Sequence, residues 1–176
     1  MLKNIPFNQF ATKVSDIWDE TRFLLTCGDF EKGEFNTMTV GWGSFGYLWK
    51  MPLAMVVVRP TRYTYEFINR FDTFTLNAFP KGYKSALNLL GTKSGRDGDK
   101  ITESGLTPAA SETIASPGFI EADLWIECRK MYWHDFDPDK FLLEEIIKVY
   151  PKSNFHTMYF AKIEQIRGDP EKYQSD

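Results

Sequence analysis

Apolar and polar positions alternate most clearly between Phe119 and Trp133. Side chains two residues apart in a strand share a face, so this alternation predicts a long antiparallel strand pair with one apolar face and one face in water. The two sets of positions are Ile120, Ala122, Leu124, Ile126 and Cys128 on one side, and Glu121, Asp123, Trp125, Glu127 and Arg129 on the other.

Shorter apolar runs predict the remaining strands. The run over residues 53–59 is almost continuously apolar, which is typical of a strand buried on both sides, and Pro60 ends it. The other strands are expected at residues 22–27, 35–44, 74–79 and 155–166.

Helical spacing occurs only in short segments. Tyr65, Phe67, Ile68 and Phe71 recur at the spacing of a helix, with Thr61 as its expected N-cap. A second helix is expected at residues 81–90, a short amphipathic helix or arm within 1–20, and a frayed polar tail at 167–176. The pattern predicts a mainly β protein, an all-β barrel with short peripheral helices, formed as one domain over residues 1–176.

Small residues collect on one face of the expected strand 35–44. Thr37, Thr39, Gly41 and Gly43 share that face, opposite Met38, Val40, Trp42 and Ser44. Such a face lets a flat ligand approach the backbone closely, or it lets another strand pack tightly against it. The pattern alone leaves both interpretations open.

A turn with hydroxyl and guanidinium groups follows the buried strand. Thr61, Arg62 and Thr64 stand where a strand ends and a helix begins. Backbone N–H groups and the positive end of the helix dipole favour a phosphate at such a place. Many helix starts of this kind bind nothing, so the turn is weak evidence when it is considered alone.

A polar, glycine-containing segment spans residues 92–100 and includes Ser94, Gly95 and Lys100. A solvated loop is its simplest interpretation. Its alternative is a second set of contacts to a phosphate or to a sugar-like chain.

Composition narrows the possible partners. A net charge of -3 argues against non-specific binding of nucleic acid. Two distant cysteines and the absence of a secretory or membrane-spanning run predict a cytoplasmic protein without membrane association. Aromatic residues make up 16% of the chain, which favours thick β packing, stacking on a flat ligand or a subunit interface.

Five motifs in order resemble one family, the flavin reductase-like FMN-binding split barrels, and within it the flavoredoxin type. The resemblance covers residues 27–107 well and continues more loosely to residue 166. It implies a six-stranded antiparallel Greek-key split barrel, a homodimer, and one FMN per subunit near the dimer interface. The motifs are Asn36–Trp42, Trp49-x-x-Pro52, Val58–Ile68, Phe74–Asn77 and Ser94–Lys100.

The resemblance also implies roles for particular positions. Thr37, Met38 and Thr39 would lie against the flavin ring, and Thr61, Arg62 and Thr64 would hold the phosphate. Asn77 and Phe79 would border the ribityl chain and ring, and the loop with Ser94, Gly95 and Lys100 would close over the phosphate side. The chain departs from many relatives at Ala161, where they carry glycine after a histidine motif that matches His156–Phe160 here. This departure concerns the nicotinamide side of the site.

Three functions compete on this basis. The first is an FMN-dependent oxidoreductase that takes electrons from NADH or NADPH and passes them to a flavin or another small-molecule acceptor. The second is a flavoredoxin-like electron carrier reduced by a redox partner protein. The third is a barrel that binds no flavin. No catalytic triad, acid–base pair or metal cluster is evident, and a flavin enzyme needs none because the cofactor carries the chemistry.

The two histidines are candidates for contacts with the nicotinamide or substrate. His156 is the better candidate of the two, and protonation would improve its binding to a phosphate. His134 and Cys27 are weaker candidates, since a lone histidine or a small buried thiol is commonly structural.

Overall fold

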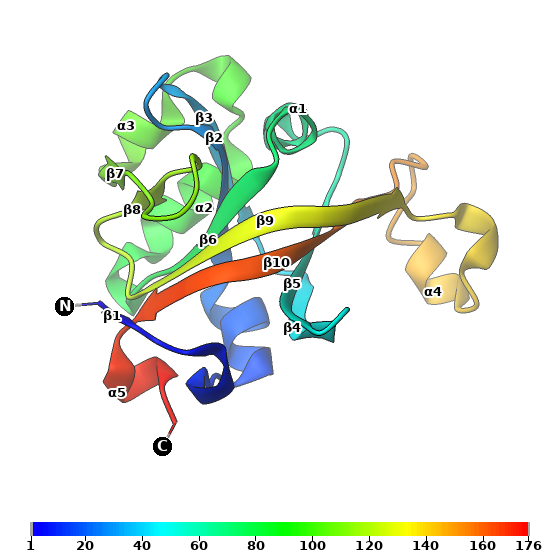
Figure 1. Ribbon diagram of the computed structural model, residues 1–176. Helices are drawn as coiled ribbons and strands as arrows, with labels where there is room; N and C mark the ends of the chain where they lie inside the picture. The colour runs from blue at the N-terminus through cyan, green and yellow to red at the C-terminus, as the bar shows by residue number, and fades with distance from the viewer. Residues whose placement is uncertain (1, 176) are drawn as a thin grey trace.

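The computed structural model describes residues 2–175. An antiparallel sheet has the strand order β3-β2-β6-β9-β10-β5-β4, with β1 added along β10. It curls into a barrel (Figure 1). The strands are β1 (Lys3–Asn4), β2 (Phe23–Asp29), β3 (Glu34–Val40), β4 (Gly43–Leu48), β5 (Met51–Val58), β6 (Thr73–Ala78), β9 (Leu124–Asp135) and β10 (Thr157–Gly168).

The barrel is split between β3 and β4. These strands are neighbours in sequence, yet they lie at opposite ends of the strand order and form no ladder with each other within residues 2–175. One edge of β3 therefore presents backbone N–H and C=O groups that have no strand partner. The mainly β, split-barrel class is confirmed, with eight strands in the sheet where six were expected.

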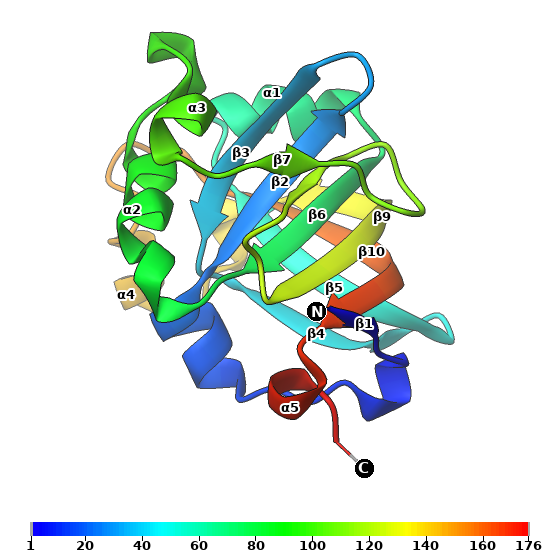
Figure 2. The same ribbon diagram turned by 90° about the vertical axis from the view of Figure 1, so that its left-hand side faces the viewer.

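Short helices surround the barrel, and Figure 2 shows α2 and α3 beside β3. None of the helices within residues 2–175 is both long and apolar enough to span a membrane. The α-helices are α1 (Tyr63–Arg70), α2 (Lys84–Thr92), α3 (Lys100–Ser104), α4 (Glu144–Ile147) and α5 (Pro170–Tyr173). The π-helix is Asp16–Thr21, and the 3-10 helices are Phe7–Gln9, Lys81–Tyr83, Gly95–Asp97 and Pro138–Lys140.

Two apolar clusters lie on the two sides of β2. Phe23 and Leu25 point into the barrel core with Val56, Phe74 and other strand residues. Leu24 points outward and packs in a second cluster with residues of α2. Because both faces of β2 are buried, its run of apolar residues is continuous rather than alternating.

The prediction that one face of residues 119–133 lies in water is wrong at Trp125 and Glu127, although Arg129 is exposed and Glu121 is partly exposed. Residues 124–135 form β9, which pairs with β6 and β10, whereas Gly118–Phe119 (β8) pairs with Pro108–Ala109 (β7). The segment that carries β7 and β8 crosses the outside of the sheet (Figure 2), where Ser116 bonds to Gly28 and Thr73. It buries Trp125 and Glu127, which the alternation placed in water.

The expected strand over residues 35–44 is interrupted at residues 41–42, where β3 ends and the edge strand β4 begins. Gly43 packs directly on Trp18, since a Cβ at this position would stand 2.3 Å from the indole Cη2. Close packing therefore accounts for the small residue at Gly43, as one of the two sequence interpretations proposed.

The C-terminal segment is packed, contrary to the expected frayed tail. Helix α5 buries Tyr173, whose hydroxyl donates to Asp123 at 3.0 Å. Phe10 and Gln174 form a β-bridge, so the two ends of the chain lie close together (Figure 1). The last long strand runs over Thr157–Gly168, two residues later than expected.

Candidate functional site

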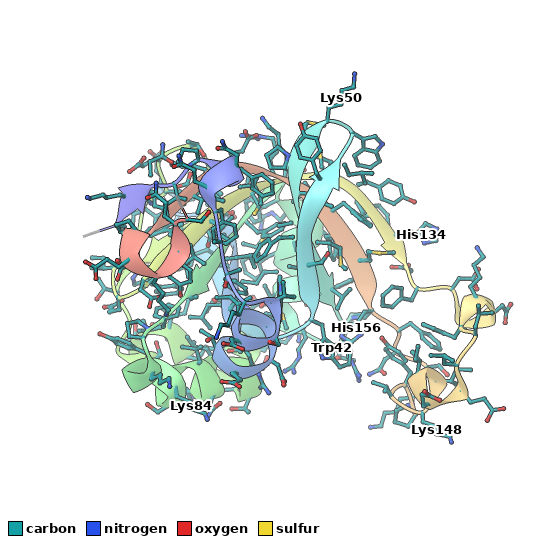
Figure 3. The ribbon with its side chains drawn as sticks, turned by 90° about the horizontal axis from the view of Figure 1, so that it is seen from below. Trp42, Lys50, Lys84, His134, Lys148 and His156 are labelled. Atoms are coloured by element: carbon teal, nitrogen blue, oxygen red, sulfur yellow. The ribbon has the colours of Figure 1, made fainter. Side chains whose placement is uncertain are left out.

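A cavity of about 430 Å³ opens where the barrel is split. Residues 38–41, at the end of β3, form one wall, and the end of β5 and α2 contribute others. Trp42 and His156 lie next to each other at this cavity (Figure 3), with ring centroids 5.1 Å apart. The unpaired edge of β3 thus offers backbone donors and acceptors along a slot with aromatic walls.

A smaller cavity of about 70 Å³ shares Met38, Arg62 and Thr92 with the larger one. It unites the two polar segments that the sequence singled out. The predicted residues that line it are Thr61, Arg62, Thr64, Ser94, Gly95 and Lys100, and Met38 lines both cavities.

Two cations at this smaller cavity are held by the C-terminal carbonyls of α2. Lys100 donates from Nζ to the Leu90 carbonyl at 2.9 Å, and Arg62 donates from Nη1 to the Gly91 carbonyl at 3.0 Å. Lys100 is only 4% exposed and has no carboxylate partner within residues 2–175. Burial, and then the charge of Arg62, lowers the pKa of Lys100 to about 8. An anion in this cavity would relieve the repulsion between the two cations.

The loop over residues 94–97 lies directly against the start of α1. A Cβ on Gly95 would stand 2.5 Å from Oδ1 of Asn36 and 2.9 Å from Cδ1 of Tyr63, so only glycine fits. Asn36 donates from Nδ2 to Oγ1 of Thr64 at 2.7 Å, and Ser94 Oγ accepts the N–H of Arg96. These contacts fix the shape of the smaller cavity.

The sequence predicted Thr61 as the N-cap of α1, and this prediction is wrong. The N-cap is Arg62, and no side chain caps the helix. The N–H of Tyr65 donates to the Arg62 carbonyl, whereas the hydroxyl of Thr61 and the N–H groups of Tyr63 and Thr64 have no hydrogen-bond partner within residues 2–175. Free N–H groups at a helix start are the arrangement that binds anions.

Positive charge dominates the larger cavity. Arg22, Arg59 and Arg62 line it, and Asp19 is the only carboxylate among its described lining residues. A concave site with charges of one sign concentrates ligands of the opposite sign. The sequence analysis did not single out Arg22 or Arg59; the position of Arg59 at the end of a buried strand was the available signal.

His156 lines the larger cavity and is 8% exposed. Its Nδ1 lies 2.8 Å from the hydroxyl of Tyr150. Burial, assisted by Arg59 and Arg62, lowers the pKa of His156 to about 4. The imidazole is neutral near pH 7, so the expectation of a protonated His156 on a phosphate is not supported.

The other candidates from the sequence lie outside both cavities. His134 is exposed on the projecting end of β9 (Figure 3). Cys27 is buried, its thiol donates to the Thr73 carbonyl at 3.0 Å, and burial raises its pKa to about 12. A buried thiol whose pKa is raised is a poor nucleophile near pH 7.

Three residues expected at the flavin also lie outside the cavity linings. Thr37 is fully buried and donates to the Leu25 carbonyl at 3.1 Å. Asn77 is buried, and Phe79 packs in the outer apolar cluster. Strand β6 carries Asn77 and is separated from β3 by β2, which keeps it away from the free edge.

Thr39 does line the larger cavity, although its side chain is engaged elsewhere. The hydroxyl of Thr39 donates to the Leu87 carbonyl of α2 at 2.5 Å. The backbone of this strand segment, rather than the Thr39 hydroxyl, is therefore what β3 offers to a ligand at this position.

The fold and the site define an antiparallel split barrel with a cationic ligand cavity along a free strand edge. The family model described as the flavin reductase like domain matches residues 21–175, and the chain belongs to this family. The family resemblance found in the sequence is thereby confirmed. No curated protein matches the chain.

Several solved structures share the fold. Flavoredoxin of Desulfovibrio vulgaris (Miyazaki F) is similar with a TM-score of 0.66 at 23% identity, over 85% of this chain and 70% of that one. The FMN-binding protein from Thermus thermophilus with bound p-hydroxybenzaldehyde has a TM-score of 0.65 at 18% identity, over 87% and 75%. The NADH:FAD oxidoreductase of Streptomyces globisporus C-1027 has a TM-score of 0.64 at 15% identity, over 85% and 75%.

Proposed function

We propose that this protein is an FMN-binding oxidoreductase that takes electrons from NADH or NADPH and passes them to a flavin or another small acceptor. The observation that carries this proposal is the smaller cavity, where residues 61–64 and 94–100 converge beside the larger one. The family of the chain and the flavin named for its structural neighbours support FMN as the ligand.

The residues at the smaller cavity fit a phosphate. Arg62 and Lys100 supply charge, Thr61 and Ser94 supply hydroxyl groups, and no carboxylate is among the described lining residues. Lys93 also lines this cavity but is already paired with Glu103 at 2.6 Å. Arg62 and Lys100 would therefore hold the phosphate of FMN through charge-assisted hydrogen bonds.

The larger cavity fits a flat ring. Residues 38–41 of the free β3 edge would bond to its polar rim, and Trp42 and His156 would cover part of its surface. When bound, FMN supplies the capacity to accept a hydride and to pass electrons on. The chain contributes binding, orientation and exclusion of water.

His156 would orient the second ligand as a neutral hydrogen-bonding group. The contact of its Nδ1 with the Tyr150 hydroxyl fixes the ring, and its Nε2 forms no hydrogen bond within residues 2–175. Nε2 is therefore free for a ligand in the cavity.

An electron carrier reduced by a partner protein is the second candidate function. Trp42 lines the cavity and is nevertheless 51% exposed, so an aromatic side chain reaches from the flavin site to the surface. The structural likeness to the Desulfovibrio vulgaris flavoredoxin accords with this alternative.

We further propose that the protein is a cytoplasmic homodimer and that each chain forms one FMN-binding domain. Exposed aromatic side chains gather on the β4–β5 hairpin and on β9, and Trp49 lies 6.5 Å from Tyr132 between ring centroids. Permanent interfaces are rich in such residues. A dimer in sedimentation at micromolar concentration supports the proposal, and a single monomeric species contradicts it.

Anaerobic titration of the FMN-loaded protein with NADH and with NADPH tests the proposed reaction. Bleaching of the flavin by either nucleotide identifies the donor, whereas reduction only by dithionite leaves the carrier as the better function. His156→Ala should slow reduction by the nucleotide without altering the FMN spectrum or dithionite reduction. Equal rates for both proteins in stopped flow would remove His156 from the second ligand's site.

A further inference from the structure

The arginines of this chain fall into two groups. Four lie away from the larger cavity, and each forms an ion pair with a carboxylate. Three line the larger cavity, and within residues 2–175 their side-chain hydrogen bonds go to backbone carbonyls alone. The paired group is Arg70, Arg96, Arg129 and Arg167, and the unpaired group is Arg22, Arg59 and Arg62.

Arg62 is accounted for by the smaller cavity, where it stands with Lys100. Arg22 and Arg59 line only the larger cavity. Two guanidinium groups without an ion-pair partner within residues 2–175 therefore remain at the larger cavity after the phosphate of FMN has been assigned to the smaller one, and Asp19 is the single described carboxylate beside them. Guanidinium groups bind phosphate and pyrophosphate oxygens in a bidentate manner.

Arg22 is held at the cavity by an unusual backbone. It follows the π-helix Asp16–Thr21 with φ 61° and ψ 168°, a conformation that is essentially restricted to glycine. Its Nε donates to the Asp19 carbonyl at 3.2 Å, and its Cδ lies beside Gly41, 3.5 Å from where a Cβ would stand. Strained residues and single π-turns occur frequently at functional sites.

Arg59 approaches the cavity from the end of β5. Its Nη2 donates to the Val149 carbonyl at 3.2 Å, and its guanidinium stacks over the ring of Tyr150 at 5.1 Å from the centroid. These contacts orient the group without neutralising its charge. Tyr150 also bonds to His156, so Arg59 and the free Nε2 of His156 belong to one connected assembly.

We infer that Arg22 and Arg59 bind the phosphoryl groups of the second ligand at the larger cavity. This inference rests on the proposed function and names the class of that ligand: a phosphate- or pyrophosphate-bearing nucleotide. Two sources share this chemistry, a pyridine dinucleotide as electron donor and a free flavin nucleotide as acceptor. A neutral acceptor would leave both guanidinium groups without an ion-pair partner.

The test is calorimetric titration of the FMN-loaded protein with two phosphoryl probes. ADP-ribose, which carries a pyrophosphate and no nicotinamide, represents the dinucleotide, and additional FMN represents the acceptor. Arg22→Gln and Arg59→Gln should each weaken binding of at least one probe by roughly tenfold or more. Arg129→Gln, which removes an equal charge away from the cavity, is the matched control and should change neither affinity.

The outcomes distinguish a pyridine dinucleotide donor from a flavin nucleotide acceptor. Weaker binding of ADP-ribose alone assigns the site to a dinucleotide, and weaker binding of additional FMN alone assigns it to a flavin acceptor. Unchanged affinities in both variants, or no binding of either probe to the unaltered protein, overturn the inference. If the protein binds no FMN, the proposed function fails separately; inorganic pyrophosphate titrated into the apoprotein then gives the same comparison of variants.

Arg22→Gly distinguishes a binding role from a structural one. Glycine adopts φ 61° without strain, so this variant should unfold at a higher temperature and bind the probe more weakly. Equal or lower thermal stability together with unchanged probe affinity contradicts the assigned role.

Discussion

Two charged regions of this molecule are built on opposite principles. At the outer face of β9, the fully buried carboxylate of Glu127 accepts the N–H groups of Glu112 at 2.9 Å and Thr113 at 2.7 Å. It also receives the hydroxyl of Thr113 and the guanidinium of Arg167. The chain itself thus completes this carboxylate's interactions.

At the cavities, the side chains of Lys100, Arg62, Arg22 and Arg59 have carbonyl partners but form no ion pair within residues 2–175, and Asp19 is the single described carboxylate that lines the larger cavity. Lys100 and Arg62 bond only to the end of α2, and Arg22 and Arg59 bond only to nearby carbonyls. Buried charge with a full set of internal partners stabilises a fold, whereas charge without a counter-ion at a cavity implies a ligand. Substitutions at the first region should affect stability, and substitutions at the second should affect binding.

Glu127→Ala should give the largest effect. It leaves Arg167 and the covering loop without their partner, and breaking a buried pair costs about 3–5 kcal/mol. Urea unfolding of the variant and the unaltered protein measures the loss. The affinity of the folded fraction for FMN should stay the same. A loss of under about 1 kcal/mol in the free energy of unfolding would contradict the contrast between the two regions.

Arg62→Ala should show the opposite pattern, with weaker FMN binding and little change in stability. Losing one charge-assisted contact should weaken FMN by ~1.5–3 kcal/mol, roughly tenfold to over a hundredfold. Because Arg62 is exposed, unfolding in urea should change little. Arg70→Ala, at an exposed arginine paired with Glu34 outside the cavity, is the control. Unchanged FMN affinity for Arg62→Ala places the phosphate elsewhere.

The charge of Lys100 predicts a pH dependence. In the apoprotein its pKa is lowered to about 8, whereas a phosphate favours the charged form. FMN affinity should therefore fall above pH 8, by up to about tenfold per pH unit. Lys100→Arg, charged at every accessible pH, should bind FMN with a flat profile in this range. A flat profile for the unaltered protein would show that Lys100 does not contact the phosphate.

The same group affects the stability of the apoprotein. The unfolded chain binds this proton more tightly than the folded chain does, because the lysine pKa falls from 10.5 to about 8 on folding. Lys100 therefore opposes folding below pH 8, and that opposition fades as the pH rises from about 8 to 10.5. In the Lys100→Met variant, the free energy of unfolding measured in urea should lack the rise that this lysine contributes between about pH 8 and 10.5.

The smallest effect is expected for Thr61→Ala. The hydroxyl of Thr61 is exposed at the smaller cavity and caps no helix, so its removal should weaken FMN by ~0.5–1.5 kcal/mol without affecting stability. Thr61→Ser keeps the hydroxyl and should bind FMN normally. Equal affinities for the alanine and serine variants would exclude this hydroxyl from the seat.

The residues that line the smaller cavity could be predicted because their chemistry is local. Thr61 and Arg62 sit at a helix start, and Gly95 and Lys100 lie in a polar loop; each segment carries its donors within a few residues. Their convergence needed only the order of motifs that the family resemblance supplied. The mainly β class was likewise visible in the strand-length apolar runs.

Features that depend on distant segments could not be read in this way. Glu127 alternates like a surface residue, and only the return of the loop over residues 110–117 buries it. Asn77 lies outside the cavities because β2 is inserted between β6 and β3, which alternation does not encode. Arg22 reaches the cavity through a π-helix and a positive φ, neither of which has a pattern in the sequence.

The most direct measurement is the affinity of the apoprotein for FMN and for riboflavin, which differ only by the phosphate. With Arg62 and Lys100 both engaged, FMN should bind at least roughly a hundredfold more tightly than riboflavin. The double variant Arg62→Ala, Lys100→Met should reduce that ratio towards one. Equal affinities of the unaltered protein for the two flavins would contradict the account.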